Sequence, residues 1–237
     1  MRKDKKLRVV SLIALSISVL GLTLGFAAFS NTLTISSSAS VSPDSSDFKL
    51  VFYGVEDATK FDEYGDFDTE VTSLVKSEPL VGGRATATTA VIDNEALTIK
   101  NMNVAYVEPG DDANYYFLVK NEGKYPVYIT HEDFMEFANN FVNKTCVAKE
   151  GTTDSLVQEA CRNINGYVLF DDHVNGHHFD SQFPHGDSDY MEIPVGGSAD
   201  LIIWLSYFDS LLPRADGDFE VIYDDAKLTY STVKPVE

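Results

Sequence analysis

The segment "NVAYVEPGDDANYYFLVKNEGKYPVYI", residues Asn103–Ile129, predicts three consecutive β-strands joined by two tight turns. The first turn is Pro109–Asp111 and the second is Asn121–Gly123, and both contain residues that favour turns. The residues between the turns include Tyr115, Tyr116, Phe117 and Val119, which are aromatic or β-branched and favour an extended chain. This alternation of strands and tight turns is typical of an antiparallel sheet.

Similar strand-like runs lie on both sides of this segment. They are punctuated by turn residues every 8–12 positions, the spacing typical of an antiparallel β-sandwich. We therefore expect an all-β fold of roughly ten strands in one domain over residues 48–237, with Trp204 in its core. The expected strands cover 48–55, 86–93, 96–107, 113–121, 125–130, 166–170, 190–195, 199–208, 218–223 and 226–233.

Residues 130–165 interrupt this pattern and predict a small helical insertion. In "THEDFMEFANNFVNK" the apolar residues recur with helical spacing, and Thr130 is placed to cap the helix start. A shorter helix is expected over Asp154–Ala160. Cys146 and Cys161 lie in the same segment, and in an exported chain we expect them to form a disulfide. The expected apolar face of the first helix consists of Phe134, Phe137, Ala138, Phe141 and Val142.

The amino-terminal residues 1–28 predict an export signal. Five basic residues (Arg2, Lys3, Lys5, Lys6 and Arg8) precede an uncharged apolar run, Val9–Ala28. The run is also just long enough to cross a bilayer as a helix, so a cleaved signal peptide and a retained membrane helix both remain open. For the cleaved form, we expect the cut between Ala28 and Phe29. The expected location is outside the cell, either secreted or at the cell surface.

Residues 29–47 predict a long extended strand followed by a turn. Every even position from Ser30 to Ser42 is Ser or Thr, and a period of two places successive side chains on opposite faces. Such a strand needs a partner for its backbone and its apolar face. It can add to the sheet of a neighbouring subunit, pair within its own sheet, or serve as a stalk above a membrane anchor. The apolar side chains are Phe29, Leu33, Ile35, Ala39 and Val41.

The order of these features resembles the TasA/camelysin family of exported proteins of Gram-positive bacteria. The resemblance covers the export region and about half of the remaining chain. The serine-rich "SSSASVSP" and the helical insertion depart from the family pattern. The matching residues are Ala27, Ala28 and Phe29, then Pro109, Gly110 and Asp111, then Phe117, Val119, Asn121 and Gly123.

This resemblance implies a jelly-roll-like sandwich that forms or decorates extracellular fibres of a biofilm matrix. The extended strand of residues 29–41 in one subunit, here called the donor strand, would complete the sheet of the next subunit. The implied partners are further copies of the chain or related matrix subunits, after processing by the export machinery and signal peptidase. A membrane-anchored monomeric surface protein is the first alternative, and a camelysin-like metal-dependent peptidase is the second.

The residues give little support to an enzyme, and we expect neither catalysis nor a cofactor. The zinc motif H-E-x-x-H is absent, because His131-Glu132 has no second histidine at the required position. A histidine-rich segment, "DDHVNGHHFDSQFPHGDSD", contains ligand types that suit Zn²⁺ or Cu²⁺, but its Asn, Gly and Pro residues favour a polar loop. The weak metal candidates are His173, His177, His178 and His185.

The net charge of −19 opposes binding to nucleic acids or anionic lipids, since both require a positive surface. We therefore expect no nucleic-acid partner, and membrane contact only through residues 9–28 if they are retained.

Overall fold

The computed structural model describes residues 47–60, 71–172, 177–182, 189–208 and 218–235. In these residues the chain is mostly β, with antiparallel pairing between strands and two α-helices. One sheet has seven strands, in the order β13–β12–β15–β9–β1–β2, with β4 also paired to β9. These strands are β1 (Leu50–Val55), β2 (Val71–Ser73), β4 (Leu80–Gly82), β9 (Asp112–Asn121), β12 (Ile164–Asp172), β13 (His177–Asp180) and β15 (Ser198–Tyr207).

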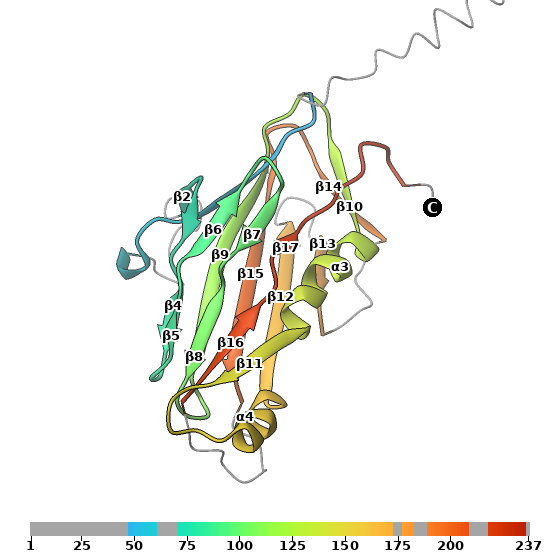
Figure 1. Ribbon diagram of the computed structural model, residues 1–237. Helices are drawn as coiled ribbons and strands as arrows, with labels where there is room; N and C mark the ends of the chain where they lie inside the picture. Colours follow the sequence, from blue (N-terminus) through green and yellow to red (C-terminus); the bar gives the residue numbers. More distant parts are fainter. Residues whose placement is uncertain (1–46, 61–70, 173–176, 183–188, 209–217, 236–237) are drawn as a thin grey trace, which may run out of the picture. The chain divides into compact units, whose positions relative to one another are not determined.

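Two four-stranded sheets and one strand pair complete the β-structure of the described residues (Figure 1). The first sheet has the order β11 (Lys144–Ala148), β16 (Phe219–Tyr223), β8 (Asn103–Tyr106) and β5 (Thr86–Ala87). The second has the order β17 (Ala226–Lys227), β7 (Thr98–Lys100), β6 (Ala90–Asp93) and β3 (Lys76–Ser77). Strand β10 (Val127–Thr130) pairs with β14 (Tyr190–Ile193), and η2 (Ala58–Lys60) is a short 3₁₀ helix.

Strand β9, which the sequence predicts as a strand, lies at the centre of the seven-stranded sheet. It pairs with β15 on one side and with β1 and β4 on the other. Tyr115, Phe117 and Val119 are fully buried in the main core, where they meet side chains from both four-stranded sheets. On the opposite face, Tyr116 and Leu118 are buried in a smaller apolar cluster. Both faces of this strand are therefore covered, which fits its nearly continuous apolar sequence.

The predicted helices are confirmed as α3 (His131–Val142) and α4 (Asp154–Cys161). The Thr130 hydroxyl accepts from the Asp133 N–H, and the Asp133 carboxylate accepts from the Thr130 N–H, which forms a capping box. Burial acts to raise the pKa of Asp133, but hydrogen bonds from Thr130 and Thr229 together outweigh it and lower that pKa. The helix start is therefore fixed by a carboxylate that favours its charged form.

The helical segment also differs from its prediction. Val142 is 53% exposed, so its assignment to the buried face is wrong. At 3.6 residues per turn it lies about 80° around the helix from Phe134, at the margin of the apolar stripe. The segment also contains strand β11, which pairs with β16 along its whole length. Residues 130–165 thus contribute a sheet strand as well as helices.

The prediction that Trp204 lies in the core is wrong, because 48% of this residue is exposed. Strand β15 buries Leu201, Ile203 and Leu205 on the core face, so Trp204 projects from the other face of the sheet. The run "LIIWL" is apolar at every position, so its sequence does not indicate which alternate residues face inward.

Candidate functional site

The structure does not describe every residue that the sequence singled out. The proposed cleavage junction and the whole predicted donor strand lie outside the described residues, as do two of the histidines. These positions are Ala28, Phe29, Leu33, Ile35, Ala39, Val41, His173 and His185. The remaining positions can be placed, and they direct attention to the region where the chain enters the β-domain.

The Pro109–Asp111 turn anchors one end of β9. Asp111 is 1% exposed, and its carboxylate accepts hydrogen bonds from the backbone N–H groups of Arg84, Val107 and Glu108 at 2.6, 2.7 and 3.0 Å. Gly110 has a φ of +99°, a conformation that L-residues with a side chain rarely adopt. The residues Pro109, Gly110 and Asp111, which match the TasA/camelysin pattern, therefore have a structural role, because they close the turn before β9.

Asn121 anchors the other end of β9. It is fully buried, and its Nδ2 donates to the carbonyl oxygens of Tyr125 and Ile193, both at 2.9 Å. Its Oδ1 accepts from the Gly123 N–H at 2.9 Å. A side chain at Gly123 would place its Cβ 2.6 Å from Asp47 O and 2.7 Å from Lys49 N. Glycine is therefore required because the incoming chain passes directly over this turn.

The contacts at this crossing form an N-terminal clamp between residues 47–49 and 122–125. The N–H of Glu122 donates to Lys49 O at 2.8 Å, and the N–H of Lys124 donates to Asp47 O at 2.7 Å. Two ion pairs, Lys49–Glu122 at 2.7 Å and Lys124–Asp47 at 2.6 Å, join the same segments. The clamp thus fixes residues 47–49, where the described part of the chain begins, against the β-domain.

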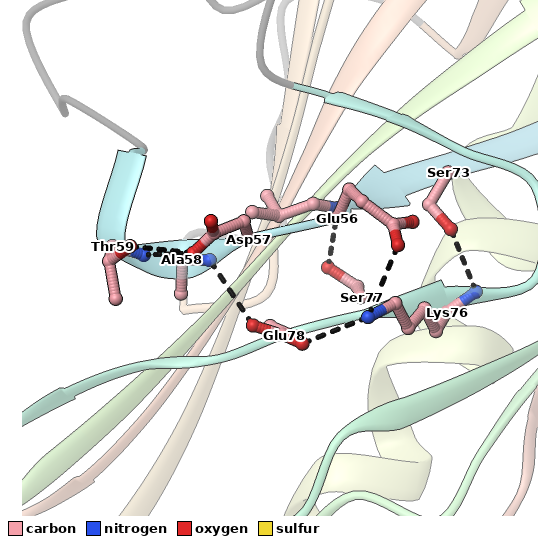
Figure 2. Close-up of polar contacts among 9 residues, drawn as sticks. Glu56, Asp57, Ala58, Thr59, Ser73, Lys76, Ser77 and Glu78 are labelled. Atoms are coloured by element: carbon pink, nitrogen blue, oxygen red, sulfur yellow. Dashed lines mark hydrogen bonds and ion pairs between the residues drawn. The ribbon is translucent and has the colours of Figure 1, made fainter.

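Strand β1 begins at the clamp, and the edge that faces away from β9 is covered at its end by residues 77 and 78. Val55 N–H donates to Ser77 Oγ at 3.0 Å, and its carbonyl accepts from Glu78 N–H at 2.9 Å. Figure 2 shows how this region is tied together: Lys76 bridges Glu56 and Glu78 at 3.4 and 2.9 Å. The hydrogen bond from Lys76 is the main cause of the lowered pKa of Glu78.

The middle of this edge is covered by one side chain. Asn94 Nδ2 donates to Phe52 O at 3.1 Å, and Asn94 Oδ1 accepts from Phe52 N–H at 2.7 Å, as a neighbouring strand would. Backbone groups alternate in direction along a strand, so those of Leu50 point to the same side as those of Phe52. On the side away from β9, no strand of the described residues pairs with β1 beside Leu50. The start of β1 therefore presents a sheet edge without a strand partner, here called the open edge, where Leu50 itself is 3% exposed.

A groove of about 760 Å³ lies at this open edge. It is formed by residues 48–50, the β6–β7 connection at 94–97, and residues 227–230. Leu50, Leu97 and Leu228 form its apolar floor and belong to the main core, while Lys49, Glu95 and Lys227 provide charged groups. We call this the β1 groove. Its walls come from three distant parts of the sequence, and no motif in the sequence indicates it.

The described histidines do not form a metal centre. His177 and His178 are adjacent in β13, opposite Asp172 and Asp171 of β12, so successive side chains project to opposite faces. No group of three or more His, Cys, Asp or Glu side chains in the described part of the chain is arranged to hold a metal ion. Neither described α-helix has the length and apolar character of a membrane span.

The structure joins Cys146 of β11 to Cys161 at the end of α4 by a disulfide, with a Cα–Cα distance of 6.1 Å. A cross-link over 15 residues stabilises the native state by about 3 kcal/mol in the chain-entropy model.

A Cys146→Ser, Cys161→Ser variant is therefore expected to lose about 3 kcal/mol of unfolding free energy in urea titration. The unmodified chain in reductant should show the same loss. Equal stability of the oxidised chain and the variant would contradict this expectation.

Comparison with protein families, curated proteins and solved structures finds no match to this chain.

Proposed function

We propose that this chain is an exported, non-enzymatic structural protein with a jelly-roll-like sandwich, which forms or decorates extracellular fibres of a biofilm matrix. Assembly occurs when residues 29–41 of one copy add to the sheet of the next. The observation that carries this proposal is the β1 groove, where an open sheet edge lies beside an apolar floor continuous with the main core. A strand bound there would satisfy both requirements of strand addition, backbone pairing and apolar burial.

The pattern of residues 29–41 suits this groove. An extended chain placed beside Leu50 would turn one set of alternate side chains toward the floor and the other toward solvent. Leu33 and Ile35 lie on the apolar face, and Thr32 and Thr34 lie on the other. Burial of Leu33 and Ile35 would contribute roughly 1.5–3 kcal/mol each.

The N-terminal clamp gives the donor segment a fixed origin. Asp47, Phe48 and Lys49 are held by the Asn121–Gly123 turn, and Phe48 and Lys49 also line the β1 groove. The described chain therefore begins beside the groove that a neighbour's strand would occupy. This geometry permits either exchange between copies or insertion into the chain's own groove, so the decisive experiment must distinguish the two.

The test is deletion of residues 29–41 from the exported chain. We expect fibres from the complete mature chain in negative-stain electron microscopy, and soluble subunits from the deletion variant in analytical sedimentation. A synthetic peptide of residues 29–41 should bind the variant with one site per subunit. A peptide with Leu33 and Ile35 both replaced by Asp is the matched control and should not bind.

Two outcomes would overturn the proposal. Fibres formed by the deletion variant as readily as by the complete chain would show that the strand is not needed. A complete chain that stays monomeric, with its strand cross-linked to its own β1 groove, would establish pairing within one subunit instead.

A further inference from the structure

The outer face of the seven-stranded sheet carries an exposed aromatic site on β12 and β15, which lie side by side (Figure 1). Tyr167 lies directly opposite Trp204, and Asn165 lies directly opposite Ser206. These residues line a pocket of about 340 Å³, at the lower end of the range for small-molecule sites. We call this the Trp204 site. Its lining residues are Asn165, Tyr167, Gln182, Trp204, Ser206 and Phe208.

The aromatic rings of the site are available to a ligand. Trp204 is 48% exposed and Phe208 is 55% exposed. Phe208 is four residues beyond Trp204, so the two Cα positions are about 13 Å apart in an extended chain. The Tyr167 hydroxyl donates to Asp180 Oδ2 at 2.8 Å, which fixes the direction of this ring. Clustered exposed rings of this kind mark binding surfaces rather than the ordinary surface of a folded domain.

The polar side chains of the site have unused hydrogen-bonding capacity. Asn165, Gln182 and Ser206 make no side-chain hydrogen bond within the part of the chain that the structure describes. An amide offers both donors and an acceptor, and a hydroxyl offers one donor and two acceptor lone pairs. These groups therefore place hydrogen-bond donors and hydrogen-bond acceptors beside the aromatic rings.

The lining of the site is uncharged, and the carboxylate of Asp180 lies next to it, where it accepts from the Tyr167 hydroxyl. None of its six lining residues is ionic, although the whole chain has a net charge of −19. Burial, and then the hydrogen bond to Asp180, raise the pKa of Tyr167 to about 12, so its hydroxyl remains protonated at neutral pH. A nucleic acid or an anionic polymer would find no cation here to pair with its charge.

We propose that the Trp204 site binds a neutral polysaccharide. Sugar rings present apolar C–H faces that can stack on Trp204 and Phe208, and their hydroxyl groups can exchange hydrogen bonds with Asn165, Gln182 and Ser206. The two Cα positions, about 13 Å apart in an extended chain, are separated by more than one sugar unit, which suits a polymer. A stable protein partner usually requires about 20–30 residues on each side, far more than this pocket provides.

This inference is independent of the proposed fibre assembly, because the Trp204 site shares no residue with the β1 groove. Trp204 is the single tryptophan of the chain, so its fluorescence reports directly on the site. We would titrate the complete chain with soluble neutral polysaccharides (an α-glucan, a β-glucan, a galactan and a mannan). At least one is expected to shift the Trp204 emission and to shield it from iodide quenching, whereas anionic polygalacturonate should do neither.

The second measurement is affinity electrophoresis, in which the protein migrates through a gel that contains the polysaccharide it binds and is retarded by that binding. Trp204→Ala is expected to weaken retardation at least tenfold, and Phe208→Ala to weaken it less. Val195→Ala, which removes an apolar side chain that is 54% exposed outside the site, should bind as the unmodified chain does. Absence of binding to all four neutral polymers would overturn the proposal, as would unchanged binding by Trp204→Ala. Reduced self-association of Trp204→Ala in sedimentation, without any polysaccharide effect, would also overturn it by identifying a protein interface.

Discussion

Replacing Ile35 with Asp is expected to abolish fibre formation while the β-domain remains folded. In the proposed assembly Ile35 lies against the floor of the β1 groove, where Leu50, Leu97 and Leu228 belong to the main core. A carboxylate placed against this apolar floor would lose its water, and that cost exceeds the apolar stabilisation that Ile35 supplies. The expected result is a soluble chain with unchanged circular dichroism and no fibres in negative-stain images.

Thr34→Asp is the matched control, because it introduces the same charge one position away on the opposite face of the strand. It should form fibres at close to the normal concentration, whereas Leu33→Asp should behave like Ile35→Asp. If Thr34→Asp and Ile35→Asp impair assembly equally, the strand does not bury one face and strand addition at the β1 groove is wrong.

Replacing Asp111 with Ala is expected to lower the free energy of unfolding by about 3–5 kcal/mol. The carboxylate is 1% exposed and accepts from three backbone N–H groups, of Arg84, Val107 and Glu108. Alanine would leave these donors without their acceptor in a region that water reaches poorly. The loss should appear as a lower urea midpoint with an unchanged slope.

Two variants show whether this loss comes from Asp111 itself. Asp111→Asn keeps one acceptor oxygen and should give a smaller loss. Asp112→Ala removes a neighbouring carboxylate that accepts from Asn114 Nδ2 at 3.0 Å, and it should cost less than about 1 kcal/mol. A loss below about 1 kcal/mol for Asp111→Ala would show that the turn does not depend on this carboxylate.

The Asn121–Gly123 turn shows what the sequence predicts and what only the tertiary structure reveals. The sequence alone predicts a turn after β9, because Asn and Gly tolerate turn conformations. It does not predict that Gly123 is needed for the passage of Asp47 and Lys49, since those residues are more than 70 positions away. The functional meaning of the motif, as part of the N-terminal clamp, therefore depends on the tertiary structure.

The sequence by itself determined the elements whose causes are local. Alternation and β-branched or aromatic residues located β9 and most of the other long strands, and Thr130 with Asp133 located the start of α3. The spacing of Cys146 and Cys161 indicated a cross-link that the structure contains. Each of these features follows from residues that are close in sequence.

Only the tertiary structure decided which surfaces became available for binding. The apolar run of β15 has no alternation, so only the packing of its sheet on the main core shows that Ile203 faces inward and Trp204 outward. The β1 groove likewise exists only because residues 48–50, 94–97 and 227–230 meet in space. Both sites depend on hydrogen bonds and apolar contacts between distant segments, and local sequence preference carries no information about which distant segments pair.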